Sequence, residues 1–208
     1  MAALLLNTFL QNTWTWIRQL DQELFLQINS VYTNSFLDMV YPWYREGNAW
    51  IPLYLFMIVF ALMNFRKKAF SWILFIVITL VLTDQISSSW VKPFFERPRP
   101  CRDPLLMSQV RLILDHCSGG FSFTSSHAAN HFGFLIFVWM TIGHIIGKWK
   151  YLLLCWTISI CYGQIYVGVH YPLDILGGAL LGLLLGWVTA RFYIQKTGII
   201  QLNESADD

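Results

Sequence analysis

The sequence has 208 residues, enough for a single domain, and 56% of them are hydrophobic while only 12% are charged. A soluble domain carries roughly 25% charged residues, so this composition excludes an ordinary soluble protein. It predicts an all-α integral membrane protein. The net charge of +2 indicates no nucleic-acid partner, and nothing in the sequence predicts an obligatory protein partner.

The first 20 residues favour an amphipathic helix that lies on the membrane surface. Apolar residues alternate there with Asn, Thr and Gln, and Trp14 and Trp16 suit the headgroup region. The alternative is a first transmembrane helix in the same segment. Residues 21–48 mix polar and apolar side chains and predict short interfacial helices. We therefore assign residues 1–48 to an N-terminal interfacial region.

Five later stretches are apolar over nearly the length that a bilayer requires, which is roughly 20 residues. They predict a helical bundle of five to six transmembrane helices in a domain at 49–196, followed by a polar C-terminal tail at 197–208. Short basic connections at 66–68 and 147–150 place one face in the cytoplasm by the positive-inside rule. The five stretches are 49–65, 69–91, 127–147, 150–168 and 172–194.

Three polar clusters flank the opposite ends of these stretches, at 92–100, 123–131 and 167–174. Because consecutive spans alternate in direction, all three clusters reach the same face of the membrane. Lys92 and Arg99 supply positive charge there, and Ser125 can cap a helix whose free N–H groups favour an anion. These groups predict a phosphate site. Snorkelling of the cations to lipid headgroups is the alternative.

Two histidines suit chemistry on phosphorus. His170 precedes Asp174 by four residues, and a carboxylate in that position can orient an imidazole as a nucleophile. We expect His127 to protonate the departing oxygen. His127 and His131 are also four residues apart, so a zinc site that includes His170 and Asp174 is an alternative. The nearby cations favour an anion over a metal.

The order of these motifs resembles the type 2 phosphatidic acid phosphatase superfamily of membrane lipid phosphatases. Its first motif is Lys, six residues and Arg-Pro, and Lys92 and Arg99-Pro100 match it completely. Its second motif, Pro-Ser-Gly-His, is matched at Ser125 and His127, with Ser126 in place of glycine. The resemblance covers roughly residues 49 to 190.

The third motif of this family, Ser-Arg, five residues, His, three residues and Asp, is matched at His170 and Asp174 but not at its start. Gln164 stands where the family has arginine, and Gly163 where it has serine. A neutral amide binds phosphate less strongly than a guanidinium does. Other arginines are candidates for the missing charge, namely Arg97, Arg102 and Arg111.

The resemblance implies a metal-independent phosphatase that needs no cofactor and forms a phosphohistidine on His170. Asp174 would orient this imidazole, and His127 would act as the acid. The phosphoryl group would be bound by Lys92, Arg99, Ser125, Ser126 and Gln164. Because the third-motif arginine is replaced, a non-catalytic lipid-phosphate binder or transporter is the alternative function.

The expected substrate is a lipid phosphate or pyrophosphate in the bilayer. Undecaprenyl diphosphate is favoured, with phosphatidic acid or phosphatidylglycerol phosphate next and lipid A phosphates also open. We expect the bacterial cytoplasmic membrane, with the site on the periplasmic side and the C-terminus in the cytoplasm. Cys101 and Cys117 lie in the long outer connection, where a disulfide is plausible. Two unpaired thiols are the alternative.

Overall fold

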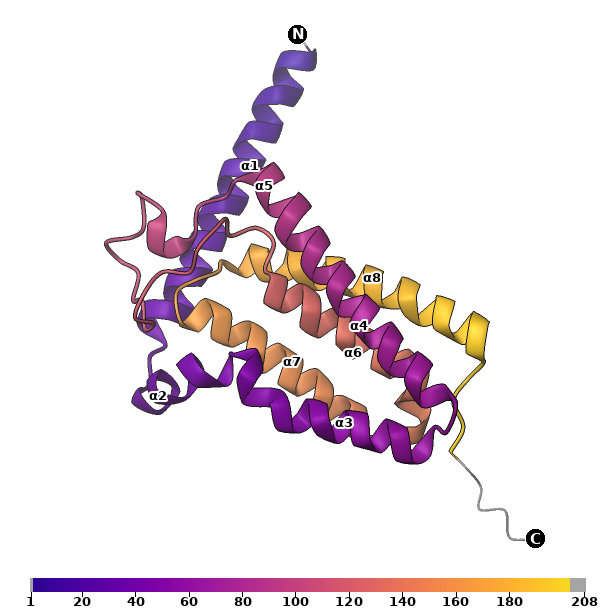
Figure 1. Ribbon diagram of the computed structural model, residues 1–208. Coiled ribbons are helices and arrows are strands. Elements are labelled where there is room, and N and C mark those ends of the chain that lie inside the picture. The colour runs from indigo at the N-terminus through magenta and orange to yellow at the C-terminus, as the bar shows by residue number, and fades with distance from the viewer. Residues whose placement is uncertain (1, 203–208) are drawn as a thin grey trace, which may run out of the picture.

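The computed structural model describes residues 2–202, and the side chains from residue 7 onward. Within this part the chain is helical, without strands, as Figure 1 shows. The long helices are α1 (Ala2–Leu26), α2 (Ser35–Tyr44), α3 (Ile51–Asn64), α4 (Lys68–Gln85), α6 (Ser126–Ile146), α7 (Trp149–Tyr166) and α8 (Pro172–Thr197). Shorter turns are Gln27–Val31, Gly47–Trp50, Ile86–Val91, α5 (Lys92–Phe95) and Pro100–Arg102.

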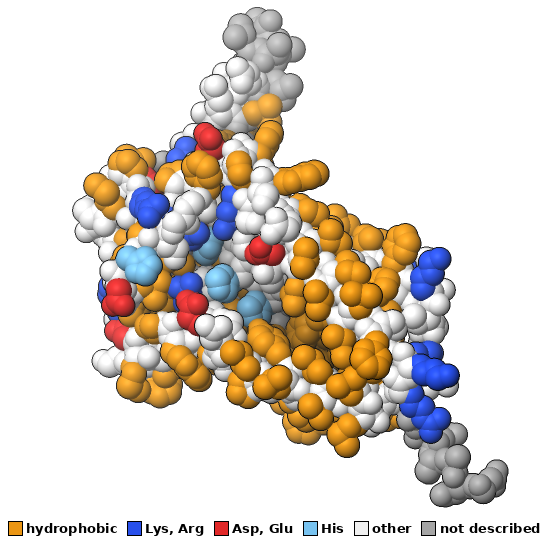
Figure 2. Space-filling view, in the orientation of Figure 1, with side chains coloured by type: hydrophobic (Ala, Val, Ile, Leu, Met, Phe, Trp, Pro, Cys, Tyr) orange, Lys and Arg blue, Asp and Glu red, His pale blue; other side chains and the backbone are white. Residues whose placement is uncertain are grey.

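The bundle that would cross the membrane is built from α3, α4, α6, α7 and α8 (Figure 1). In the described part of the chain, four helical segments are long and apolar enough to span a bilayer: Gly47–Asn64, Lys68–Arg102, Ser126–Ile146 and Pro172–Thr197. The remaining predicted span corresponds to α7, which runs alongside α6 and is not among these four. Figure 2 shows apolar side chains over the middle of the bundle and charged ones towards both ends.

Close contact between α6 and α8 forms the centre of this bundle. Three glycines of α8, Gly178, Gly182 and Gly186, face the α6 backbone. A Cβ atom at Gly182 would overlap the carbonyl oxygen of Ala129 and lie 2.9 Å from the amide nitrogen of Gly133. The four-residue repeat of glycine therefore serves helix packing, since small residues let two backbones approach.

The N-terminal region has two parts with different surroundings. Helix α1 projects beyond the bundle in Figure 1, and its Trp14 and Trp16 side chains are exposed. Further along, the side chains of Asp21, Asn29 and Arg45 are buried. This region is helical, as expected, but its second half also packs on the end of the bundle where the polar clusters lie.

The long outer connection between α5 and α6 is fastened to the rest of the chain at several points. Cys101 and Cys117 form a disulfide bond. Asn29 donates to the backbone carbonyl oxygens of Arg111 and Tyr166, at 2.8 Å in each case. Arg111 pairs with Asp38 of α2 at 2.8 Å. The connection is therefore held as an ordered cover over one end of the bundle.

Candidate active site

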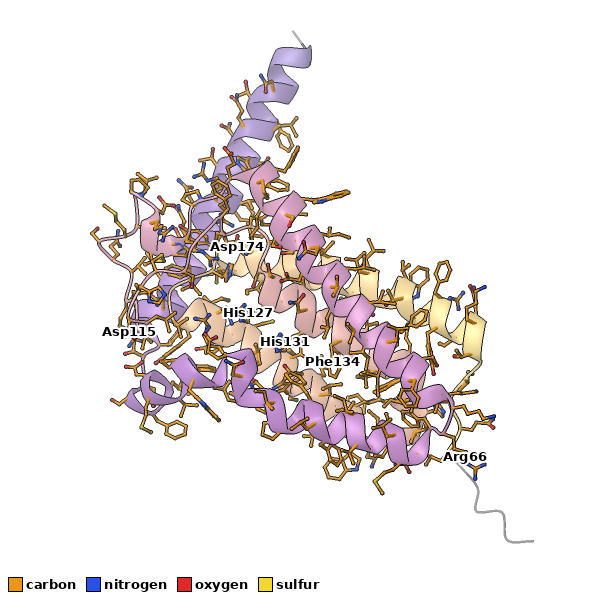
Figure 3. The ribbon with its side chains drawn as sticks, viewed as in Figure 1. Arg66, Asp115, His127, His131, Phe134 and Asp174 are labelled. Carbon is orange, nitrogen blue, oxygen red and sulfur yellow. A yellow bond between two sulfur atoms is a disulfide. The ribbon has the colours of Figure 1, made fainter. Side chains whose placement is uncertain are left out.

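The motif residues meet where the N-terminal ends of α6 and α8 come together. The Ser125 backbone N–H donates to the Asp174 carbonyl oxygen at 3.0 Å, joining the second and third motifs. Figure 3 shows His127 and Asp174 towards the same end of the bundle, with Arg66 at the other end. The sequence prediction that separate spans deliver these residues to one face therefore agrees with the structure.

His170 lies at the centre of the site and is only 3% exposed. Its Nε2 atom is 3.1 Å from Nη1 of Arg99. A guanidinium can only donate, so Nε2 accepts this hydrogen bond and the imidazole proton lies on Nδ1. Burial lowers the pKa of His170 to about 4, although the neighbouring carboxylate of Asp174 opposes the shift. The imidazole is therefore neutral at physiological pH.

Asp174 is fully buried and receives donors from several directions. Oδ2 accepts hydrogen bonds from the Ser122 hydroxyl and, at 2.8 Å, from the Tyr171 backbone N–H. Arg97 pairs with Oδ1 at 2.8 Å. The distance from Oδ2 to His170 Nδ1 is 3.5 Å, which is longer than a strong hydrogen bond. Asp174 is thus a fixed carboxylate that faces the protonated side of His170.

Arg99 is buried, and backbone carbonyl groups hold its guanidinium in place. Nε and Nη2 donate to the Gly119 oxygen at 3.1 and 3.0 Å, and Nη1 donates to the Val169 oxygen at 3.1 Å. Gly119 lies just beyond Cys117, and Arg99 lies just before Cys101. The disulfide therefore closes the loop whose two ends carry Arg99 and its acceptor.

The remaining first- and second-motif residues surround these groups. Ser125 is buried, and its hydroxyl accepts from the Ala128 N–H at 3.3 Å, so it caps α6 as expected. The Ser126 and Ser87 hydroxyls are 3.0 Å apart. Lys92 is half-buried, and its ammonium group has no hydrogen-bond or ion-pair partner among the described residues. His127 is half-buried and within electrostatic range of His170 and Lys92.

The start of the third motif is enclosed by protein. Gln164 is fully buried, and neither its amide nitrogen nor its amide oxygen has a partner in the part of the chain that is described. The Tyr41 ring covers Gly163 so closely that a Cβ atom there would lie 2.7 Å from it. A serine at Gly163, as the family pattern has it, would therefore require the Tyr41 ring to shift.

Several residues at this end were not identified from the sequence. Ser122 binds the carboxylate of Asp174, and Asp21 of α1 pairs with Arg97 at 2.5 Å. Asp21 also accepts from the Leu173 N–H at the start of α8, at 2.8 Å. Neither Ser122 nor Asp21 belongs to a motif. The only sequence signal for Asp21 is a carboxylate in a segment that is otherwise suited to a membrane surface.

A metal centre is a separate possibility for a site rich in histidine. Among the side chains described, from residue 7 to residue 202, no three histidine, cysteine, aspartate or glutamate residues are grouped as ligands. His131 instead bonds through Nδ1 to the His127 carbonyl oxygen at 2.8 Å, and its ring lies 4.9 Å from that of Trp156.

The fold and the site together define an integral membrane protein with a buried histidine, carboxylate and guanidinium in one polar centre. The model of the PAP2 superfamily matches residues 69–197, more than half of the chain. The chain therefore belongs to the PAP2 superfamily, as its motifs predicted.

Named relatives agree with this assignment. Lipid A 4'-phosphatase of Bacteroides thetaiotaomicron is 29% identical over 182 residues, 83% of this chain and 76% of that protein. The crystal structure of Aquifex aeolicus LpxE has a TM-score of 0.56 at 30% identity, over 81% of this chain and 93% of its own. A transmembrane PAP2 type phosphatidylglycerolphosphate phosphatase from Bacillus subtilis shares the fold, with a TM-score of 0.62 at 20% identity over 87% of each chain. The chain is a membrane phosphatase of this family.

Proposed function

We propose that this phosphatase removes a phosphoryl group from a membrane lipid through a phosphohistidine at His170. The observation that carries the proposal is the contact of 3.1 Å between Arg99 Nη1 and His170 Nε2. It assigns the lone pair of the imidazole to Nε2, where Arg99 donates to it, and so places a cation beside the nucleophilic nitrogen. A phosphate drawn to the cation is thereby brought to the nucleophilic nitrogen.

In the first step, Nε2 of His170 forms a bond to phosphorus while the bond from phosphorus to the lipid oxygen breaks. The His127 imidazolium, which the bound anionic phosphate would stabilise, gives its proton to that oxygen, so the lipid leaves as a neutral alcohol or, from a diphosphate, as the lipid monophosphate. The imidazole becomes positively charged, and Asp174, 3.5 Å from Nδ1, stabilises that charge. Arg99 and Lys92 offset the charge of the phosphoryl oxygens.

In the second step, water attacks the phosphohistidine and the bond between nitrogen and phosphorus breaks. His127, deprotonated in the first step, now takes a proton from this water. Inorganic phosphate leaves, and both imidazoles return to their starting states. The buried, neutral state of His170 suits this cycle because the nucleophile needs no prior deprotonation.

An apolar cavity beside the site supports a lipid substrate. It has a volume of about 200 Å³ and lies among α3, α4, α6 and α7. Asn130 and His131 line it, one turn of α6 from His127. Figure 2 shows histidine side chains between a group of charged side chains on one side and apolar side chains of the bundle on the other. A lipid tail in this cavity would leave its phosphate at the histidines.

The lipid itself is chosen from the named relatives and the motifs. Lipid A bearing a 4'-phosphate is our first candidate, because that relative is 29% identical to this chain, whereas an undecaprenyl-diphosphatase of Sulfolobus acidocaldarius is 25% identical over a similar share. Undecaprenyl diphosphate, which the sequence analysis favours, is the second. We further propose the bacterial cytoplasmic membrane, with the site on the periplasmic side and the C-terminus in the cytoplasm.

The test is phosphate release from purified protein in detergent, with lipid A, undecaprenyl diphosphate, phosphatidylglycerol phosphate and phosphatidic acid as separate substrates. We expect turnover of at least one lipid, and we expect His170→Asn to abolish it. His116→Asn is the matched control, because His116 is exposed in the outer connection. Normal turnover by His170→Asn would overturn the mechanism, and no turnover of any lipid would overturn the substrate class.

A further inference from the structure

The third motif lacks one positive charge, because Gln164 stands where the family has arginine. The three arginines suggested by the sequence are all engaged elsewhere. Arg97 pairs with Asp21 and Asp174. Arg111 pairs with Asp38 on the outer side of the bundle. Arg102 is exposed and donates to the Cys117 carbonyl oxygen at 3.1 Å.

A fourth arginine, Arg45, has donors that are not engaged. It directly follows α2 and is only 5% exposed. Nη2 lies 3.1 Å from Oε1 of Glu46, whose side chain is half exposed. Nε and Nη1 are buried without a hydrogen-bond partner in the described part of the chain. A buried guanidinium with free donors is costly unless it has an anion to bind.

The packing of α2 on α7 places this guanidinium near the third motif. The Tyr41 ring covers Gly163, and the Tyr44 hydroxyl lies 2.6 Å from that of Ser159. The end of α2 therefore lies along the part of α7 that immediately precedes Gln164. Tyr41 and Arg45 are four residues apart and so share one face of this helical turn.

The charge of Arg45 also reaches the groups that would handle phosphate. It acts electrostatically on the His127 imidazole and on the Arg99 guanidinium. Two cations held near each other without an intervening carboxylate repel, and a dianionic phosphate between them would relieve that repulsion. Glu46, the only carboxylate paired with Arg45 in the described part, lies towards solvent.

We propose that the Arg45 guanidinium binds the phosphoryl oxygens of the substrate and replaces the arginine that this family carries at the position of Gln164. The inference rests on the proposed function, because it assigns a residue to that same site. It makes the N-terminal region part of the phosphate site. The ligand class is a phosphate monoester or diphosphate, bound by three cationic side chains, Lys92, Arg99 and Arg45.

The experiment compares Arg45→Gln and Arg45→Lys with Arg66→Gln, a loss of the same charge at the opposite end of the bundle (Figure 3). We expect Arg45→Gln to lower kcat/KM by about 10- to 100-fold, as for the loss of hydrogen bonds to a charged group. It should weaken inhibition by orthovanadate to a similar extent. Arg66→Gln should change neither quantity.

A second-site variant separates a phosphate role from a structural one. In the double variant Arg45→Gln with Gln164→Arg, the guanidinium returns to the family position. We expect it to recover at least about tenfold in orthovanadate affinity over Arg45→Gln alone. A protein in which Arg45 only supports the fold would gain nothing from Gln164→Arg.

Binding of orthovanadate is also measured by thermal shift, which requires no turnover. If no lipid is hydrolysed but orthovanadate stabilises the wild type and not Arg45→Gln, the proposed function fails and the Arg45 assignment stands. If Arg45→Gln does not fold, Arg45→Lys decides, since loss of the planar donor should weaken orthovanadate binding. Unchanged orthovanadate affinity in a folded Arg45 variant would overturn the inference.

Discussion

Replacing Gly182 by alanine should disturb the site from a distance. The added Cβ would overlap the Ala129 carbonyl oxygen and lie 2.9 Å from the Gly133 nitrogen, whereas ordinary contacts begin at 3.4 Å. The contact with the Gly133 nitrogen alone requires the two helices to separate by about 0.5 Å, and the closer carbonyl oxygen requires more, because both obstacles are backbone atoms. Overpacking of this kind lowers stability by roughly 1–3 kcal/mol. Because the clash here is with backbone atoms, we expect a loss of about 3 kcal/mol.

The measurement is the melting temperature of the purified protein in detergent, together with phosphate release. A loss of about 3 kcal/mol corresponds to a fall in Tm of roughly 6–12 °C for a chain of this size. Activity should fall as well, since separation strains the bond from the Ser125 N–H to the Asp174 oxygen. Gly47→Ala is the control, because a Cβ there meets nothing within 4 Å. A Gly182→Ala protein that melts within about 2 °C of the wild type would refute the packing argument.

Two further predictions concern the covering loop and pH. The variant Cys101→Ser with Cys117→Ser should lose about 3 kcal/mol for a cross-link with a sequence separation of 16, and it should also lose activity because the loop holds Arg99. Cys155→Ser is the control, and an unchanged Tm would contradict the prediction. The pKa of His170 is lowered to about 4 in the folded protein, whereas in the unfolded chain it is about 6.5. Between these two pH values the unfolded chain binds a proton at His170 and the folded protein does not. Stability should therefore fall as pH drops through this window, by up to roughly 3 kcal/mol. The His170→Gln variant should not show this loss of stability between about pH 6.5 and pH 4. If the Tm of the variant and of the wild type changed in parallel with pH, the histidine would not be buried and neutral.

Much of the bundle follows from local pattern. Long apolar runs bounded by short polar connections can satisfy their backbone groups in a bilayer only as helices, so the predicted spans correspond to α3, α4, α6, α7 and α8. Alternation of direction along the chain then brings the polar clusters to one face. The prediction of a polar tail at 197–208 lies mostly outside the described residues, and α8 continues to Thr197.

The family motifs allowed the positions of the motif residues to be predicted, because the residues lie at helix ends where spacing along the chain determines position; their catalytic roles stay a prediction. His170 immediately precedes the N-cap residue of α8 and Asp174 lies in the first turn of that helix, so their short separation along the chain places them together. Arg99 could be identified from its motif, but the groups that accept its hydrogen bonds could not. Its acceptors on Gly119 and Val169 come from a loop and a turn whose paths no periodicity describes.

The sequence by itself determined a helical membrane phosphatase of a known superfamily and the motif residues that face one side of the membrane. Only the tertiary structure decided that Asp21, from a region assigned to the membrane surface, pairs with Arg97 beside that site, and that Arg45 of the same region is buried with free donors. The reason is physical. Hydropathy reports where a segment prefers to lie, whereas an ion pair between residues 76 positions apart depends on how distant helices pack. The close fit of Tyr41 on Gly163 and of Gly182 on Ala129 sets that packing.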